Sequence, residues 1–358
     1  MDQNSAVIAM SGGVDSSVAA CLMKERGYTC MGATMKLFQN EDLGIPSEKT
    51  CCSLDDIEDA RSVAFQLDIP YQVFNFSDRF EEKVICPFIQ AYENGQTPNP
   101  CIECNRSMKF DKLYSRASEL GYHYVATGHY ARIERDSKTG RFLLKKAIDQ
   151  NKDQSYVLYM LSQEQLARTQ FPLGGLTKPE VRGIAEAHGL VNARKRESQD
   201  ICFVPDGKYA DFIEKYTGKT WPAGDFIDQD GHVLGRHRGI IRYTIGQRKG
   251  LGLSFPQPMY VCAVDPIRNT VTLGPSEALF TDTLTVKRIN LISVPSINAP
   301  LHLKAKIRYR QKEQWATVQQ TDTDTLQIHF DQPQRAITKG QAAVLYDGDT
   351  VVGGGTIQ

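Results

Sequence analysis

The chain has 358 residues, of which 41% are hydrophobic and 23% charged, and its formal net charge is zero. This composition indicates a globular protein of about two or three domains and argues against a disordered, collagen-like or mucin-like chain. The N-terminal sequence lacks the basic and apolar stretches of a signal peptide, and no apolar run reaches the roughly 18 residues that span a bilayer, so we expect a cytoplasmic protein with no membrane partner.

Strand-like and helix-like patterns alternate over the first 130 residues. The expected strands are Ala6–Met10, Met31–Phe38, Tyr71–Phe76 and Tyr122–Thr127. Apolar spacing predicts helices over Ser16–Arg26, from Asp55 to Leu67, around Phe80–Phe88 and from Phe110 to Leu120. This alternation predicts an α/β fold with a doubly wound parallel sheet, covered by helices on both faces.

Helix-start signals mark the middle of the chain. Ser162-x-x-Gln165 and Thr177-Lys178-Pro179-Glu180 are capping-box patterns, and the second has a proline where the first helical turn accepts one. An apolar helical stripe from Val181 to Ala185 continues the second pattern. We interpret His188 as the edge of that stripe and not as a ligand.

The pattern changes beyond about residue 206, where glycines punctuate short segments, and strands dominate from Leu284 onward. From Leu301 to Arg310 apolar and polar residues alternate, which predicts a strand with four fixed positive charges on one face. Asp347-Gly348 lies between two apolar runs and predicts a hairpin. We expect a small β-barrel or sandwich here, and we place three domains at 1–205, 206–276 and 277–358.

Charge is distributed unevenly along the chain. The first hundred residues carry 7 basic and 15 acidic side chains and the rest carries 35 and 27, so the net charge changes from −8 to +8. Residues 231–250 contain five basic side chains and no Asp or Glu. This distribution fits a polyanion-binding face or an ordinary solvated surface.

The segment Ser11-Gly12-Gly13-Val14-Asp15-Ser16-Ser17 lies between an expected strand and an expected helix. Its glycines allow the backbone to approach phosphate oxygens, and the N–H groups at the helix start form an anion site. The serine hydroxyls add donors, and Asp15 is a candidate Mg²⁺ ligand. The Gly-Lys-Ser/Thr ending of a Walker A loop is absent, so we predict a phosphate-binding loop of another kind.

This loop resembles that of the PP-loop ATP pyrophosphatases, which cleave ATP between the α and β phosphates and transfer adenylate to a substrate oxygen. Further stretches along the whole chain are similar to those of the tRNA-specific 2-thiouridylase family, which thiolates the wobble uridine. These stretches are Cys51–Ser53, Thr97–Asn105, Ala126–Tyr130, Lys152–Tyr156, Glu197–Phe203 and Tyr243–Gly250. The resemblance implies an adenine nucleotide alpha-hydrolase-like N-terminal domain, a small central domain that contacts tRNA, and a C-terminal tRNA-binding β-barrel.

Thiolation replaces a carbonyl oxygen by sulfur. That oxygen leaves once it is adenylated, and a cysteine persulfide can hold the incoming sulfur. A second cysteine can then attack the persulfide, release its sulfur into the product and close a disulfide. The resemblance implies that Cys202 carries the persulfide and that Cys104 is its nucleophilic partner, with sulfur supplied by a sulfur-carrier or cysteine desulfurase protein. Both thiols would need a depressed pKa, which neighbouring cations can supply. The candidates are Arg106 and Lys109 near Cys104, and Arg194, Lys195 and Arg196 before Cys202.

The nine cysteines are expected to be thiols, redox groups or metal ligands and not structural disulfide bridges, because the chain has no export signal. Packing is the expected role of Cys21, Cys30 and Cys262, and Cys51-Cys52 has no assigned chemistry.

Cys101 stands where many family members carry Asp. With Cys104 and Cys202 it offers three thiolates, enough to hold a [4Fe–4S] cluster with one iron open to sulfide. The persulfide route, the cluster route and a structural metal or spectator thiol all stay open.

The resemblance also implies the binding residues. ATP, with Mg²⁺ on Asp15, is expected to contact Ala9, Met10, Ser11, Gly12, Gly13, Val14, Asp15, Ser16, Met35 and Gly128. The target base and the rest of the tRNA are expected to contact Asn99, Pro100, Cys101, His129, Lys152, Asp153, Gln154, Tyr309, Arg310 and Gln341.

ATP-dependent 2-thiolation of tRNA is the function that the sequence favours. One rival is a PP-loop ligase acting on a small carbonyl substrate, which would need neither paired cysteines nor a basic strand. The other is a non-catalytic RNA-binding or metal-stabilised protein, which would tolerate alanine at Cys104 and Cys202.

Overall fold

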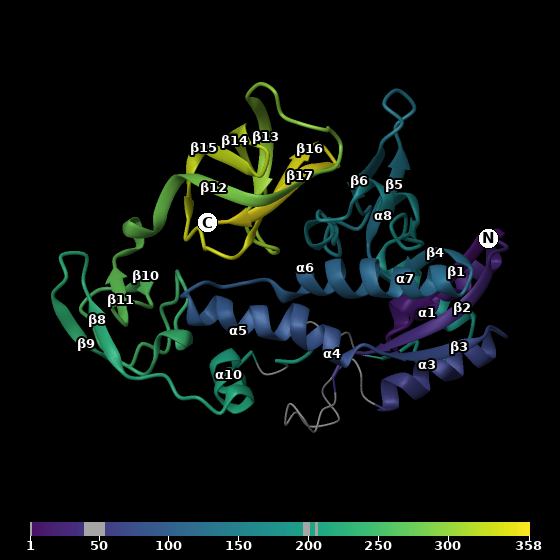
Figure 1. Cartoon of the computed structure of the whole chain (residues 1–358), viewed down its shortest axis with the longest axis horizontal. Coiled ribbons are helices and arrows are strands. Elements are labelled where there is room, and N and C mark those ends of the chain that lie inside the picture. The colour runs from purple at the N-terminus through teal and green to yellow at the C-terminus, as the bar shows by residue number, and fades with distance from the viewer. Residues whose placement is uncertain (1, 39–53, 196–200, 205–206) are drawn as a thin grey trace. The chain divides into compact units, whose positions relative to one another are not determined.

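The computed structural model describes residues 2–38, 54–195, 201–204 and 207–358. Its internal contacts divide the chain, drawn in Figure 1, into two compact units. The first unit is Met1–Val84, Cys101–Gly207 and Gly348–Val352, and the second is Ile85–Pro100, Lys208–Asp347 and Gly353–Gln358. The pair Cys51-Cys52 lies outside the described residues, and the boundaries between the three predicted domains stay a prediction.

The first unit is built on a parallel sheet with the strand order β3-β2-β1-β4-β7. Its strands are β1 (Asp2–Ala9), β2 (Thr29–Lys36), β3 (Tyr71–Asn75), β4 (Tyr122–Thr127) and β7 (Thr169–Gln170). Every residue from Ser5 to Met10 is buried, so both faces of the sheet are covered. The predicted α/β fold with a doubly wound parallel sheet is confirmed.

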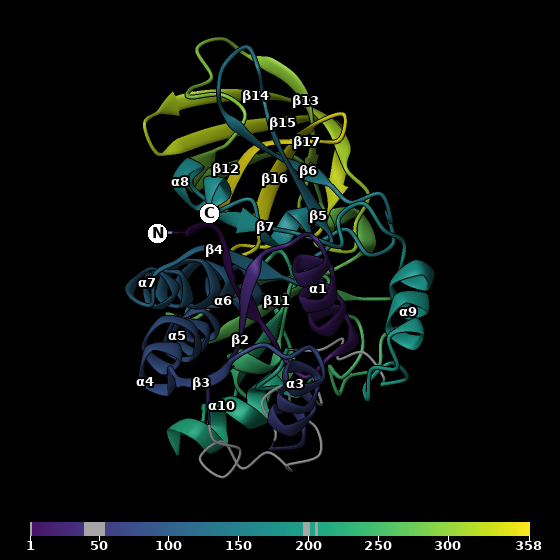
Figure 2. The same cartoon turned by 90° about the vertical axis from the view of Figure 1, so that its right-hand side faces the viewer.

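Helices flank this sheet on opposite sides, as Figure 2 shows. On one side α1 (Val14–Glu25) packs against α3 (Leu54–Gln66) and α9 (Lys178–Ala187). On the other side lie α4 (Ser77–Phe80) and α7 (Leu113–Glu119), and α7 contacts β4. Cys21 and Cys30 are buried in the core of this unit, as predicted.

The predicted helix starts in the middle of the chain are confirmed. The capping box of α8 (Gln163–Ala167) forms between Ser162 and Gln165, and that of α9 forms between Thr177 and Glu180. His188 caps the end of α9, and its Nε2 lies 3.0 Å from Glu25 Oε1.

Two features of the first unit differ from simple periodic patterns. A hairpin of β5 (Ala131–Arg135) and β6 (Phe142–Lys146) was not predicted, and Thr350 pairs with Lys145 of β6. Between α6 (Pro100–Cys104) and α7, residues Asn105–Lys112 form a π-helix, a variant that is frequent at functional sites.

The second unit contains two β structures and the helices α5 (Cys86–Glu93) and α10 (Tyr209–Thr217). The small sheet has the order β10-β11-β8-β9, with β8 (Gly224–Ile227), β9 (Val233–His237), β10 (Tyr260–Asp265) and β11 (Thr270–Gly274). The larger structure runs β12-β15-β14-β13-β16-β17 and closes through β12–β17 pairing. The predicted C-terminal β-barrel is confirmed.

The barrel strands follow the polar-apolar alternation of the sequence. They are β12 (Phe280–Leu291), β13 (Leu301–Lys306), β14 (Gln314–Asp322), β15 (Thr325–Arg335), β16 (Ala342–Asp347) and β17 (Thr350–Ile357). The hairpin at Asp347-Gly348 is confirmed, but the strand predicted to reach Arg310 ends at Lys306. It ends there because the chain turns, and Arg308 donates to the Ala336 carbonyl and the Thr338 hydroxyl. Among the helices of the described residues, none has both the length and the apolar character required to cross a bilayer.

Candidate active site

The phosphate loop joins the end of β1 to the start of α1. Its hydroxyls are fixed by the loop's own backbone, since Ser16 Oγ and Ser17 Oγ donate to the Gly13 carbonyl at 3.0 and 3.1 Å. The Ser11 N–H donates to Ser16 Oγ at 3.2 Å. Gly13 is the N-cap of α1 and supplies no side-chain cap, so the first N–H groups of the helix are available to an anion.

Two glycines allow other backbone segments to lie directly against this loop. Gly12 has φ +72°, and a Cβ there would lie 2.3 Å from the Asp56 carbonyl oxygen. A Cβ on Gly128 would lie 2.7 to 2.9 Å from main-chain atoms of Asp15 and Ser16. Gly128 therefore lies against the start of α1, where the sequence analysis expected a nucleotide contact.

The sheet topology places the expected adenine contacts near one edge. Half-buried Met35 is the penultimate residue of β2, and Gly128 directly follows β4. Met35 and Gly128 thus lie at the carboxyl ends of the two strands that flank β1. In open parallel sheets, ligands bind outside the carboxyl ends of the strands, at the point where the strand order reverses. Ala9, Met10 and Val14 of the loop region are buried.

Asp15 is bonded to a lysine that the sequence analysis did not single out. The Lys178 ammonium donates to Asp15 Oδ1 at 2.7 Å, and the Tyr130 hydroxyl donates to the same oxygen at 2.8 Å. Lys178 is 8% exposed. A signal was present, because a lysine at the first position of a helix is disfavoured by the helix dipole and needs another reason to be there.

The segment after α9 also contacts the phosphate loop. Asn192 is 3% exposed, and its Nδ2 donates to the Gly12 carbonyl at 3.0 Å and to Ser17 Oγ at 2.8 Å. Lys195 Nζ donates to Asp56 Oδ1 at 2.7 Å and to Asp59 Oδ2 at 2.5 Å. Lys195 was a candidate for the cation that depresses the pKa of Cys202, but in the structure its charge is balanced by two aspartates.

The two proposed catalytic cysteines belong to the same unit. Cys104 ends α6 and begins the π-helix, and both Cys104 and Cys202 are half-buried. Cys202 is followed by Phe203, whose ring meets that of Phe80 at 5.8 Å, edge to face. Since α4, which ends at Phe80, also contacts the π-helix, both cysteine-bearing segments lie against α4.

Cys101 is exposed at the start of α6. Within the described residues, the sulfurs of Cys101, Cys104 and Cys202 do not form a group of donor atoms within 4.8 Å of one another. The cations expected beside Cys104 are engaged elsewhere: Arg106 lies 3.8 Å from Glu103, and Lys109 Nζ lies 3.3 Å from a histidine nitrogen.

That histidine is His129, which the family resemblance implies is a tRNA contact. It is 7% exposed, its Nδ1 lies 2.7 Å from Thr127 Oγ1, and its ring packs beside Phe110 and Phe171. Burial, with a smaller effect of the Lys109 charge, lowers the pKa of His129 well below 6.5. The imidazole is therefore neutral at neutral pH and accepts from Lys109.

Two members of the expected tRNA-binding triplet have internal partners. Asp153 is buried, and its carboxylate accepts the N–H of Ala147 at 3.0 Å and the Ser155 hydroxyl at 2.8 Å. Gln154 Oε1 accepts the Tyr130 N–H at 2.9 Å. Lys152 is half-buried. Gln154 thus holds the backbone of Tyr130, and the hydroxyl of Tyr130 in turn donates to Asp15.

Within the second unit, the fold brings Gln341 to the segment that precedes the target-base residues Asn99 and Pro100. Gln341 Nε2 donates to the Thr97 carbonyl at 2.7 Å. Tyr309 is 38% exposed and Arg310 is exposed, in the turn after β13. Their roles in tRNA binding stay a prediction.

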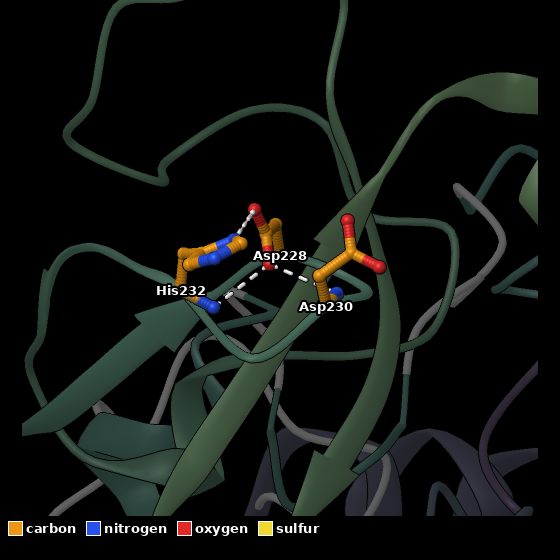
Figure 3. Close-up of side chains that lie close together, drawn as sticks. All are labelled: Asp228, Asp230 and His232. Atoms are coloured by element: carbon orange, nitrogen blue, oxygen red, sulfur yellow. Dashed lines mark hydrogen bonds and ion pairs between the residues drawn. The ribbon is translucent and has the colours of Figure 1, made fainter.

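Asp228, Asp230 and His232 are the one group of three potential metal ligands found in the described part of the chain (Figure 3). They lie in the turn between β8 and β9. Asp228 Oδ1 accepts the N–H groups of Asp230 and His232 at 2.9 and 2.8 Å. These bonds close the turn and account for the proximity of the three side chains, so we assign no metal to them.

Family models match nearly the whole chain. Residues 4–206 match a tRNA methyl transferase HUP domain, residues 210–275 match a tRNA methyl transferase PRC-barrel domain, and residues 281–357 match an aminomethyltransferase beta-barrel domain. Among solved structures, a 4-thiouridine synthetase in complex with RNA and bound ATP is 20% identical over 60% of this chain and 50% of its own, with a TM-score of 0.37. That likeness is too weak to carry an argument.

Curated relatives are much closer. The tRNA-specific 2-thiouridylase MnmA of Clostridioides difficile is 52% identical over 98% of this chain and 97% of its own length. The enzyme of the same name from Acetivibrio thermocellus is 48% identical over 100% of both chains. The chain therefore belongs to the tRNA-specific 2-thiouridylase family.

Proposed function

We propose that this chain catalyses the ATP-dependent 2-thiolation of the wobble uridine of tRNA. One observation carries the proposal: a phosphate loop whose Asp15 is bonded to Lys178 belongs to the same compact unit as Cys104 and Cys202. A phosphate loop alone fits many adenylating reactions, whereas sulfur transfer also needs two cysteines. Methyl transfer, named in two of the matching family models, needs no activation of an oxygen by ATP, so the loop favours thiolation.

In the activation step, uridine O2 attacks the α-phosphorus of ATP. The new O–P bond forms as the bond to the β-phosphate breaks and pyrophosphate leaves. The N–H groups at the start of α1 and the Ser11 hydroxyl bind the phosphates, and the Lys178 ammonium balances charge at the loop. Mg²⁺, when bound, would neutralise phosphate charge, and the Asp15 carboxylate is the type of ligand that it prefers.

In the sulfur step, the terminal sulfur of a Cys202 persulfide bonds to C2 and AMP departs with the former O2. The Cys104 thiolate attacks the inner sulfur of the persulfide, which leaves a Cys104–Cys202 disulfide. Oxidation of the two thiols to this disulfide provides the two electrons that reduce the sulfane sulfur to the thiocarbonyl level. A thiol reductant and a sulfur-carrier or cysteine desulfurase protein then restore both cysteines.

Recognition of the substrate is proposed to combine a base pocket with phosphate contacts. Asn99, Pro100 and Cys101 would lie against the target base, which is splayed out of the anticodon loop at a cost of a few kcal/mol. Exposed Tyr309 and Arg310 would contact the remainder of the tRNA. Phosphate contacts of this kind set position and salt dependence.

A [4Fe–4S] cluster is the alternative sulfur route. It would use the thiolates of Cys101, Cys104 and Cys202, which in the described residues do not lie close enough together to share a single metal ion. We derive no step through the cluster. Iron and sulfide analysis after anaerobic purification tests this alternative directly, since stoichiometric iron would rule out the pure persulfide route.

The proposal is tested by anaerobic pyrophosphate release from ATP, with and without unmodified tRNA that carries a wobble uridine. We expect strong stimulation by tRNA, formation of 2-thiouridine when a persulfide donor is present, and loss of thiolation in Cys104→Ala and Cys202→Ala. Pyrophosphate release at the same rate with and without tRNA would instead indicate a ligase for a small carbonyl substrate. Nucleotide binding without any release would indicate a non-catalytic protein.

A further inference from the structure

The buried amide of Asn192 is bonded to two groups of the phosphate loop, one on each side of Gly13. Its Nδ2 donates to the Gly12 carbonyl at 3.0 Å and to Ser17 Oγ at 2.8 Å, from a position 180 residues away in sequence. The same Ser17 hydroxyl uses its own proton on the Gly13 carbonyl at 3.1 Å. Both protons of the amide are therefore committed to the loop.

The other end of this amide makes no comparable bond. Asn192 Oδ1 is one of three buried side-chain atoms in the described residues that lack a hydrogen-bond partner. A buried acceptor without a partner is unfavourable, so the orientation of the amide is maintained by what Nδ2 does and not by Oδ1. A residue selected only to fill this space would be better served by an apolar side chain of similar size.

The bond to Gly12 has a geometric consequence for ligand binding. In a planar trans peptide the carbonyl and the following N–H point in opposite directions. Because Asn192 draws the Gly12 carbonyl toward itself, the N–H of Gly13 points to the opposite side of the peptide. A carbonyl turned the other way would present negative charge to a phosphate.

Neighbouring contacts make this arrangement rigid. The backbone of Gly12 packs on Asp56, where a Cβ would lie 2.3 Å from the carbonyl oxygen, and the Asp56 side chain is bonded to Lys195. The Lys195 N–H in turn donates to the Asn192 carbonyl at 2.9 Å. The loop is thus supported on one side by α3 and on the other by the turn that contains Asn192.

We propose that Asn192 is a positioning residue for nucleotide binding: its amide fixes the Gly12–Gly13 peptide so that the Gly13 N–H points to the phosphate chain of ATP. This inference deepens the proposed function and rests on it. It predicts a larger effect on ATP than on adenosine, because the amide acts through a peptide of the loop that is proposed to bind the phosphates.

The test compares the dissociation constants of ATP and adenosine, measured by calorimetry without tRNA. Asn192→Leu keeps the branched shape of the side chain and removes both N–H donors. Asn192→Asp keeps the size of the side chain and replaces the NH₂ group by an oxygen that repels the Gly12 carbonyl. We expect ATP to bind about tenfold or more weakly in both variants, with adenosine binding changed by less than about twofold. The control is Val191→Ala, because Val191 lies in the same turn and its side chain is 64% exposed. This variant should bind both ligands with wild-type affinity.

Three outcomes would count against the inference in different ways. Equal weakening of ATP and adenosine, or a lower melting temperature with the ATP preference intact, would mean that Asn192 only supports the fold. Unchanged ATP affinity in both folded variants would refute the inference and leave the proposed function standing. A wild-type chain that binds ATP no more tightly than adenosine would refute both.

Discussion

Replacing Lys178 by methionine removes one charge from the phosphate loop and keeps most of the side-chain stem. The Lys178 side chain is 10% exposed, that of Asp15 is 30% exposed, and Nζ lies 2.7 Å from Asp15 Oδ1. The substitution leaves the hydrogen bond from the Tyr130 hydroxyl to Asp15 Oδ1, at 2.8 Å, in place. It therefore tests whether the pair serves the reaction or only the fold.

The expected size of each effect follows from this burial. Removing one partner of a fully buried ion pair costs about 3–5 kcal/mol, but water reaches the Asp15 side chain, so we expect a stability loss of about 1–2 kcal/mol. A charge-assisted hydrogen bond to a phosphate contributes about 1.5–3 kcal/mol. Loss of such a bond should lower kcat/KM for ATP by roughly 10- to 150-fold.

The assay is tRNA-stimulated pyrophosphate release, with urea unfolding of each variant as the measure of stability. Lys178→Arg should recover part of the activity, and Lys138→Met, at an exposed lysine of the same unit, should change neither quantity. Asp15→Asn combined with Lys178→Met should lose less stability than the sum of the single changes. A folded Lys178→Met enzyme with kcat/KM within about threefold of wild type would refute the role of this ammonium in the reaction.

Other expected outcomes follow from burial and backbone geometry. Burial lowers the pKa of His129 well below 6.5, so below about pH 6.5 the unfolded chain binds a proton that the folded chain does not. The free energy of unfolding should therefore decrease as the pH is lowered below about 6.5. In urea unfolding between about pH 6 and 5, His129→Gln should reduce this slope by up to about 1.4 kcal/mol per pH unit. Gly12 has φ +72°, and a Cβ there would lie 2.3 Å from a backbone oxygen, so Gly12→Ala should abolish ATP binding in calorimetry. Gly27 has φ +81° but open space around it. As the control, Gly27→Ala should cost about 1 kcal/mol of stability and leave ATP binding intact. Burial raises the pKa of Cys21 to about 11, so about 0.1% of this thiol is ionised near pH 8. After brief iodoacetamide treatment, mass spectrometry should find the exposed Cys101 alkylated and Cys21 unmodified. Rapid labelling of Cys21 in the folded protein would contradict its burial.

Elements specified by nearby residues were predicted closely from the sequence. The strand β4 has the predicted bounds Tyr122–Thr127, and both capping boxes form between the predicted side chains. Signals of this kind act over two to four residues, so a single sequence contains them. The place of the loop between β1 and α1 was predictable for the same reason, because consecutive residues specify it.

Features that depend on distant residues were not predictable in this way. Lys178 appeared only as part of a helix cap, since its partner Asp15 is 163 residues away in sequence. The π-helix of residues 105–112 was missed because apolar spacing does not distinguish it from an α-helix. The burial of His129, which the resemblance does not address, depends on aromatic rings contributed by other segments of the fold.

The basic stretch 231–250 shows why charge counted along a sequence overestimates what a surface offers to a polyanion. Arg242 lies 2.8 Å from Asp211 and 2.5 Å from Glu214, and Arg236 lies 3.2 Å from Asp225. None of these acids lies within the stretch, so they were invisible in its composition. A phosphate that approaches these arginines must displace a carboxylate, and it therefore gains less than a phosphate meeting an arginine outside an ion pair. Binding strength and salt dependence follow the charges that a phosphate can neutralise, which the fold selects from those that the sequence contains.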